Sequence, residues 1–392
     1  MTVAEKIESI LNRSSWIRKM FEEGAKLKAQ FGEDNVFDFS LGNPNLRAPE
    51  CFDQALTEAT CTCEGDHGYM PNTGYPFVRR AVAEYLTQEQ GVAVTENDVI
   101  MTCGASGALN IAMKTLLDPG DEVITPIPCF VEYGFYADNH GGVLKTVPTR
   151  SDFTLDLDAI GDAVTPKTKV ILINSPNNPT GQIYSAESLE RLGELLASKS
   201  KQLGRTLYLI SDEPYRKIIF DGHTVPSIFS CYPDSILATS YSKDISIPGE
   251  RIGFAALNPK ATHAKIVMDG LALANRILGF VNAPALMQRI VACIQGTSVD
   301  ISHYARKRDL LCQGLSDIGY DFITPRGTFY LFPRSPMADD VAFVSILQEE
   351  RILVVPGSGF NGPGYFRIAF CVDDHVISGA MPGFKRAMER AR

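Results

Sequence analysis

The 392-residue chain has a single tryptophan, Trp16, and no apolar run near the roughly 20 residues that a membrane-crossing helix needs. It is also short of positive charge, because 37 Lys and Arg stand against 46 Asp and Glu, a formal net charge of -9. This balance argues against a broad surface for nucleic acid or for an anionic membrane, since both need clustered Lys and Arg. We therefore expect neither partner.

A signal-peptide pattern is missing as well, since the opening residues MTVAEKIESI are charged and contain no apolar stretch. The nine Cys are odd in number and scattered, and Cys61-Thr-Cys63 is too closely spaced for a zinc knuckle. Structural thiols in a reducing compartment explain this pattern better than disulfides or metal ligands do. The sequence predicts a cytoplasmic protein without a metal site.

The middle of the chain alternates short apolar runs with longer amphipathic stretches. Apolar residues make up 45% and charged residues 21% of a chain long enough for two domains. Strands are expected at 99–103, 122–125, 143–147, 169–173, 206–210, 235–239 and 252–257, with helices such as 105–117 and 186–201 between them. Because runs this apolar are typical of strands covered on both faces by helices, the sequence predicts an α/β fold with a largely parallel sheet.

The two ends of the chain have a different pattern. Residues 5–31 have the spacing of one or two amphipathic helices, and residues 36–41 alternate like a strand before Gly42-Asn43-Pro44. After residue 259 the pattern is helical through 308–318. Short strands at 327–332, 352–355 and 365–370 then precede a closing helix at 376–390. We expect the two ends to form a second, discontinuous domain.

One motif is misleading. The run from Gly357 to Gly362 matches G-x-G-x-x-G, which in dinucleotide-binding proteins opens a helix. Here Pro363 and Gly364 follow at once, and then comes the strand-like run 365–370. A flexible loop is the better interpretation.

The first segment suited to chemistry follows the predicted strand 235–239. It contains Ser240, Ser242, Lys243 and Arg251. A lysine there can form a Schiff base with a carbonyl if a nearby cation lowers its pKa, and the planar arginine suits a phosphate. A surface lysine and arginine in a loop remain an equal alternative for this segment alone.

Two more segments follow buried strands, where open α/β sheets place their ligands. Asp212, with Tyr215 three residues later, could face a protonated ring nitrogen, although it could equally cap a helix. The polar run 174–181 contains Asn178 and could as well be an ordinary turn.

The remaining two segments suit anions. Gly104, Ala105 and Ser106 open a predicted helix, whose free N–H groups and dipole suit a phosphate, although a tight strand–helix turn explains them too. Arg367 lies inside a predicted strand, and because buried arginine is rare unless paired, a carboxylate partner is expected, either a ligand or a structural Asp or Glu.

Together these five segments resemble those of fold-type I pyridoxal-phosphate (PLP) enzymes, in the aspartate-aminotransferase-like branch of the class I/II aminotransferases. The similarity is collinear from Gly42-Asn43-Pro44 to Arg367. It implies a large PLP-binding domain, residues 45–282, with a mostly parallel seven-stranded sheet between helices. Residues 1–44 and 283–392 would form a smaller α+β domain.

By position, the resemblance assigns Lys243 to the internal aldimine with PLP and to proton transfer, Asp212 to the pyridine nitrogen, and Tyr215 and Asn178 to the phenolic oxygen. The phosphate would be held by Gly104, Ala105, Ser106, Ser240, Ser242 and Arg251. Phe130 would stack on the ring, and Gly42, Asn178 and Arg367 would bind the substrate. Tyr69 would reach the phosphate of a neighbouring subunit, which implies a homodimer with shared active sites.

The resemblance predicts amino-group transfer between an L-amino acid and a 2-oxo acid. A PLP-dependent lyase, replacement or cyclisation enzyme is the alternative, because the cofactor motifs do not separate these reactions. A regulatory domain on this fold would need a DNA-binding module, for which neither end has the length or basic charge. A dicarboxylate substrate would need a second cation, for which Arg18, Lys19, Arg276 and Arg289 are candidates.

Overall fold

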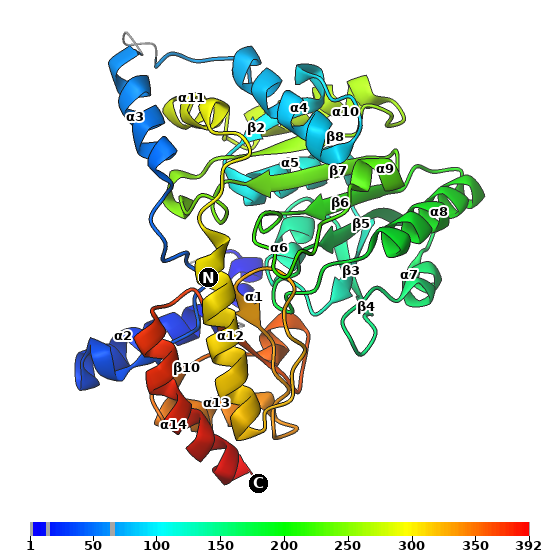
Figure 1. Cartoon of the computed structure of the whole chain (residues 1–392). Coiled ribbons are helices and arrows are strands. Elements are labelled where there is room, and N and C mark those ends of the chain that lie inside the picture. The colour runs from blue at the N-terminus through cyan, green and yellow to red at the C-terminus, as the bar shows by residue number, and fades with distance from the viewer. Residues whose placement is uncertain (1–2, 13–15, 63–66, 392) are drawn as a thin grey trace.

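The computed structural model describes residues 3–12, 16–62 and 67–391. A seven-stranded sheet flanked by helices forms the upper part of Figure 1, and small strand groups with long helices form the lower part. The strands of the large sheet are β2 (Val99–Thr102), β3 (Glu122–Ile127), β4 (Val143–Pro148), β5 (Thr168–Asn174), β6 (Tyr208–Asp212), β7 (Ser235–Ser240) and β8 (Gly253–Leu257).

The strand order in the large sheet is β2-β8-β7-β6-β5-β3-β4. Strand β8 is antiparallel to both of its neighbours, and every other pair is parallel. The predicted α/β fold with a mostly parallel sheet is therefore confirmed. The carboxyl ends of β5, β6 and β7 lie side by side at one edge, which is where ligands bind in open α/β sheets.

Side chains alternate between the two faces of the sheet, as the pleat requires. In β5, Val170 and Leu172 join one apolar core, and Ile171 and Ile173 join another. The first core includes α5 (Gly104–Leu116), α6 (Tyr133–Asp138) and α10 (Ala264–Ile277). The second includes α3 (Glu50–Thr62), α4 (Pro76–Gln90), α7 (Leu157–Ala163), α8 (Ala186–Leu203), α9 (Ile228–Cys231) and α11 (Ala285–Cys293).

A third core draws on both ends of the chain (Figure 1). Its helices are α2 (Trp16–Phe31), α12 (Ile301–Ile318), α13 (Asp340–Glu349) and α14 (Asp374–Ala391). Its strands are β1 (Phe37–Asp38), β9 (Tyr330–Leu331), β10 (Ile352–Leu353), β11 (Val355–Pro356) and β12 (Phe366–Ala369). Strand β1 pairs with β10. The predicted small domain, 1–44 and 283–392, includes helix α11, but α11 packs on α3 and α4 of the large-sheet part. The exact domain boundaries stay a prediction.

The terminal strands are shorter than the sequence predicts. In the predicted strand 36–41 only Phe37–Asp38 is a strand, because Phe39 donates its N–H to Leu353 while its carbonyl accepts from Ala369. Only Tyr330–Leu331 of 327–332 is a strand, and Thr328, at φ 66°, donates its N–H to Ile218. Because these segments form backbone hydrogen bonds to more than one neighbouring segment, neither can continue a regular ladder with a single strand.

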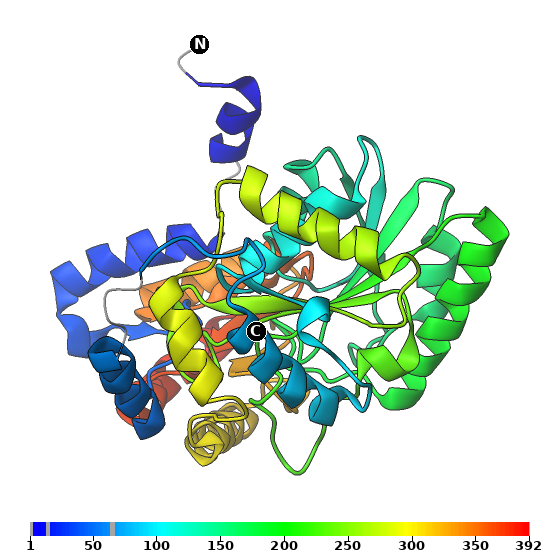
Figure 2. The same cartoon turned by 90° about the horizontal axis from the view of Figure 1, so that it is seen from above.

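Several other predictions can be compared with the described residues. The run 5–31 forms two helices, α1 (Glu5–Asn12) and α2. Helix α1 projects upward in Figure 2 and contacts α6 through an ion pair between Lys6 and Asp138. The G-x-G-x-x-G run forms a 3₁₀ turn, Gly357–Phe360, before β12, and does not open the α-helix that a dinucleotide site needs. No helix within 3–12, 16–62 and 67–391 is long and apolar enough to cross a membrane. Cys63, of the Cys61-Thr-Cys63 pair, lies outside the described residues.

Candidate active site

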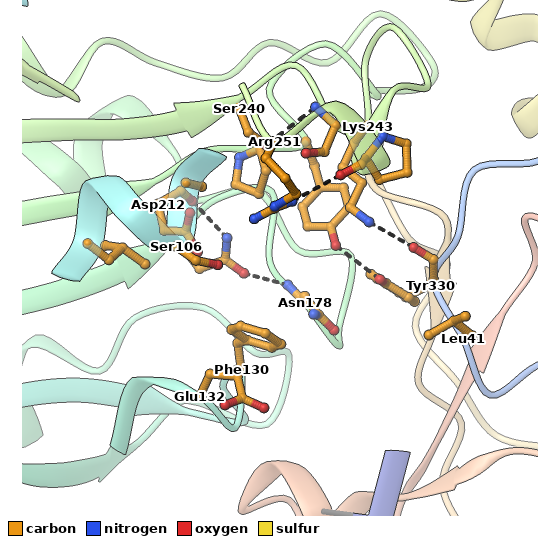
Figure 3. Close-up of a pocket in the computed structure, with 18 of the residues that line it drawn as sticks. Leu41, Ser106, Phe130, Glu132, Asn178, Asp212, Ser240, Lys243, Arg251 and Tyr330 are labelled. Atoms are coloured by element: carbon orange, nitrogen blue, oxygen red, sulfur yellow. Dashed lines mark hydrogen bonds between the residues drawn. The ribbon is translucent and has the colours of Figure 1, made fainter. Parts of the chain in front are cut away.

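A cavity of about 640 Å³ lies at the carboxyl ends of β5, β6 and β7 (Figure 3). These strands end in Asn174, Asp212 and Ser240, which all line it. The prolines at 176 and 214 follow β5 and β6, where the missing N–H prevents the ladders from continuing. Segments from both chain ends close the other side, and they contribute Gly42 and Arg367.

The cavity brings together most of the residues that the sequence predicts for the site. Those that line it are Gly42, Ala105, Ser106, Phe130, Asn178, Asp212, Tyr215, Ser240, Ser242, Lys243, Arg251 and Arg367. Gly104 lies directly behind Arg251. Tyr69 does not line the cavity of its own chain, and its side chain is 94% exposed.

Lys243 lies three residues beyond β7, with its amine inside the cavity. Its Nζ donates a hydrogen bond to the Gly42 carbonyl at 2.8 Å. Burial lowers the pKa of Lys243 to about 8, the Cys371 thiol opposes this shift, and the positive charges of Arg367 and Arg251 add to it. A lysine that loses its proton this readily is a competent nucleophile and base near neutral pH.

Asp212 has one oxygen in use and one free. Tyr133 donates to Oδ2 at 2.6 Å, whereas Oδ1 is buried and has no hydrogen-bond partner. Burial raises the pKa of Asp212 to about 7, the Tyr133 hydrogen bond opposes the rise, and the charge of Glu213 adds to it. Because buried polar atoms are normally paired, Oδ1 needs a donor that the described residues do not supply. A protonated ring nitrogen meets this need.

The Asn174 side chain connects the ends of β5 and β6. Its amide nitrogen donates to the Asp212 carbonyl at 2.7 Å, and its oxygen accepts the Asn178 N–H at 2.6 Å. Asn174 is buried. It therefore sets the positions of the Asp212 backbone and of Asn178 together.

The start of α5 and Arg251 form a site suited to an anion. Gly104 opens the helix at φ 77°, and a Cβ built on it would lie 3.0 Å from Arg251 Nη2. Arg251 itself is at φ 52°, in the left-handed region that non-glycine residues seldom adopt. Ser106 and Ser240 line the same region. Helix N–H groups, hydroxyls and a guanidinium match the needs of a phosphate.

Arg367, in β12, is 2% exposed and forms no ion pair with any residue that the structure describes. Its Nη1 donates to Asn178 Oδ1 at 3.0 Å and its Nη2 to the Ser40 carbonyl at 2.8 Å. The rings of Tyr330 and Phe360 lie 4.5 and 4.6 Å from the guanidinium carbon. The structural Asp or Glu considered as its partner is thus not found in the described chain. A buried charge without a counter-ion is costly, and a ligand carboxylate would offset that cost.

The sequence analysis missed several residues of the site. Tyr330 hydrogen-bonds Tyr215 between their hydroxyls at 3.0 Å, and its ring covers Arg367. Tyr133, Asn174 and Glu132 were missed too, although Asn174 belongs to a segment that was singled out. The only local signal for Glu132 and Tyr133 is their place in the run Phe130-Val-Glu-Tyr133, which leads into α6 beside the cavity. Burial of the two tyrosines follows from tertiary packing, which no local pattern encodes.

The residues present fit the cofactor that the resemblance implies. Asp212 Oδ1 is buried without a hydrogen-bond donor among the described residues. Gly104 has no side chain, which leaves room for Arg251 at the anion site. Phe130 lies with its ring edge-on to Tyr133, the centroids 5.6 Å apart, and lines the cavity. A pyridine nitrogen, an aromatic ring and a phosphate each have a matching group in one cavity.

Comparisons with known proteins agree with this geometry. Residues 34–381 match the family described as aminotransferase class I and II. A probable aspartate aminotransferase from Methanocaldococcus jannaschii is 32% identical over 364 residues, 91% of this chain and 94% of the relative. An aspartate/prephenate aminotransferase from Thermus thermophilus is 33% identical, over 90% and 91% of the two chains. The crystal structure of an amino transferase from Eubacterium rectale superposes with a TM-score of 0.97 at 37% identity, over 100% of both chains.

Proposed function

Because the chain belongs to the class I and II aminotransferase family, whose members depend on pyridoxal 5'-phosphate, we propose that the cavity at the ends of β5, β6 and β7 is its active site. The enzyme is an aminotransferase, which moves an amino group between an amino acid and a 2-oxo acid. One observation carries the assignment of the site. The cavity unites a lysine of lowered pKa, a buried carboxylate oxygen without a donor, and a buried arginine without a described carboxylate partner.

Each group has a distinct task in this proposal. PLP, when bound, supplies the carbonyl that takes the amino group and the ring that accepts electron density from the substrate. Lys243 would hold the cofactor through Nζ and would move the proton at the α-carbon of the substrate, as a lysine with a pKa of about 8 can do near neutral pH. Asp212 would hold the ring nitrogen through Oδ1, and Asn178 and Tyr215 would hold the phenolic oxygen.

The remaining groups bind and orient. The phosphate would be held by Gly104, Ala105, Ser106, Ser240, Ser242 and Arg251, and Phe130 would cover one face of the ring. Arg367 binds the α-carboxylate of the substrate with its planar fork, next to Gly42 and Asn178, and so fixes the α-carbon close to Lys243. The match to an aminotransferase family supports amino-group transfer over the lyase alternative.

We also propose a homodimer in the cytoplasm. Helix α10 exposes Ile266, Leu273 and Ile277, which are spaced on one helical face. Tyr69 is fully at the surface, so its hydroxyl is available to a neighbouring subunit. Eight cysteines of the described chain are free, as expected in a reducing compartment.

The proposed site is tested with Lys243→Ala and with Lys201→Ala, a control at an exposed position of α8. The PLP-loaded wild type and the control should lose their visible absorbance band when amino acids are added, and both should release 2-oxo acids. Lys243→Ala should lack that band and lose activity at least about a thousandfold, because both the anchoring amine and the general base are gone. An unchanged band in Lys243→Ala would show that another amine holds the cofactor. Pyruvate and ammonia released from cysteine would favour a lyase.

A further inference from the structure

Glu132 is a carboxylate at the cavity that has no structural task in the described chain. It precedes the first residue of α6, where a side chain often caps the free N–H groups, but it makes no capping hydrogen bond. Its carboxylate forms no hydrogen bond or ion pair with any residue within 3–12, 16–62 and 67–391. Figure 3 shows it beside Phe130, across the cavity from Lys243.

The cations that line the cavity are already assigned. Three of the lining residues are positively charged, and they serve the cofactor amine (Lys243), the phosphate (Arg251) and the α-carboxylate (Arg367). Of the four residues considered as a cation for a second substrate carboxylate, Arg276 and Arg289 do not line the cavity. Arg276 is exposed on α10, and Arg289 lies over the Tyr75 ring at 4.8 Å. The side chains of Arg18 and Lys19 lie outside the described part of the chain.

We propose that Glu132 binds the side chain of the amino donor and selects one that ends in a positively charged nitrogen over one that ends in a second carboxylate. This inference rests on the proposed active site. With the α-carboxylate on Arg367 and the amine at Lys243, the side chain is the part of the substrate left to reach Glu132. The aspartate named for several relatives would bring a like charge there.

The electrostatics of Glu132 point the same way. Burial raises its pKa, since the ionised carboxylate is partly withdrawn from water and has no partner to stabilise it. An ammonium or guanidinium group of the substrate would remove that penalty by forming a charge-assisted hydrogen bond. A substrate carboxylate would increase the free-energy cost of the ionised Glu132. Glu132 would therefore favour amino donors with a cationic side chain and disfavour those with an acidic one.

The test compares wild type with Glu132→Gln, which keeps the shape and removes the charge. The control is Glu190→Gln, at an exposed position of α8. Donors are ornithine and arginine, aspartate and glutamate, and leucine as a neutral reference. Wild type should prefer the cationic donors. Glu132→Gln should lower their kcat/KM by about ten- to a hundredfold, raise that of aspartate, and leave leucine within about twofold. Glu190→Gln should change none of these values.

Binding without turnover gives a second measurement. Calorimetric titration should show 5-guanidinopentanoate, which is arginine without its α-amino group, binding wild type more tightly than the dicarboxylate maleate, and Glu132→Gln should remove this preference. A wild type that prefers aspartate, with a ranking unchanged in Glu132→Gln, would overturn the inference and leave the aminotransferase site intact. Failure of every donor, with no Lys243-dependent absorbance band, would instead overturn the proposed site.

Discussion

Tyr133 keeps Asp212 in the form that the cofactor needs. Its hydroxyl donates to Oδ2 at 2.6 Å, and this bond opposes the rise in the Asp212 pKa caused by burial. Tyr133→Phe removes the donor, so the pKa should rise further above about 7. Because the ring nitrogen needs the ionised carboxylate, PLP affinity falls as pH drops through this pKa, and in the variant the fall should begin at a higher pH.

The measurement is the PLP dissociation constant from fluorescence titration between pH 6 and 9. At pH 7 we expect Tyr133→Phe to bind about tenfold more weakly, the value of one hydrogen bond to a charged group. Tyr320→Phe is the matched control, because Tyr320 donates to the Phe384 carbonyl in the third core, away from the cavity. A parallel loss in both variants would mean that Tyr133 acts only through stability.

Site residues could be predicted from the sequence where they lie in a short segment that follows a recognisable strand. Asp212 ends β6 and Lys243 lies three residues beyond β7, and both strands have clear apolar patterns. Asn178 lies in a polar run after β5. Tyr133 and Tyr330 were not predictable, because each acts through a partner far away in the chain: Asp212 for Tyr133, and Arg367 for Tyr330. Their local sequence is that of ordinary core aromatics.

At the scale of elements, the turn between β2 and α5 determines how closely Arg251 approaches the helix. Gly104 adopts φ 77°, and an added Cβ would meet Arg251 Nη2 at 3.0 Å. Gly104→Ala should therefore strain the backbone by about 1 kcal/mol and also displace the guanidinium from the anion site. We expect PLP affinity to fall about tenfold or more, with a smaller loss of inorganic phosphate binding to the cofactor-free protein.

Gly204→Ala separates these two effects. Gly204 ends α8 at φ 60°, and a Cβ there would meet nothing within 4 Å. Both variants should show a similar decrease in Tm, and only Gly104→Ala should lose affinity for PLP and phosphate. Equal cofactor binding in the two variants would rule out the role given to this turn.

The rejected glycine motif has a packing task instead. A Cβ at Gly357 would lie 2.1 Å from the Gly362 carbonyl oxygen, and one at Gly362 would lie 2.8 Å from Pro128. Cys129 donates its N–H to Phe360, whose ring lies against Arg367. The loop thus joins the Phe130 segment to Arg367. Flanking residues correctly predicted a loop, but its contacts required the fold.

At the scale of the whole molecule, the cavity is assembled from parts that are distant in sequence. Lys243 and Asp212 come from the sheet, whereas Gly42 and Arg367 come from the two ends of the chain. The sequence predicted this arrangement for the sheet, whose strands are long and apolar. The predicted terminal strands were too long, because the backbone of 39–42 and 327–329 forms hydrogen bonds to several different segments.

The outer surface of α10 bears on the proposed dimer. Ile266, Leu273 and Ile277 are 70%, 48% and 55% exposed on one face of the helix. Asn275, on the buried side of the same helix, donates to the Asn72 carbonyl at 2.7 Å, so the segment that follows Tyr69 is attached to α10 near its C-terminal end. A second copy that covers α10 would lie close to Tyr69.

We therefore expect the wild type to sediment as a dimer and Leu273→Glu/Ile277→Glu to shift it toward monomer. Two charges buried in an apolar interface should weaken association at least about a hundredfold. PLP affinity should fall when the dimer dissociates, because Tyr69 would no longer reach the phosphate of the neighbouring subunit. Tyr69→Phe should weaken PLP binding without changing the dimer. Leu310→Glu, at a 40% exposed position on α12, is the control. A fully active monomeric wild type would contradict both the interface and the role of Tyr69.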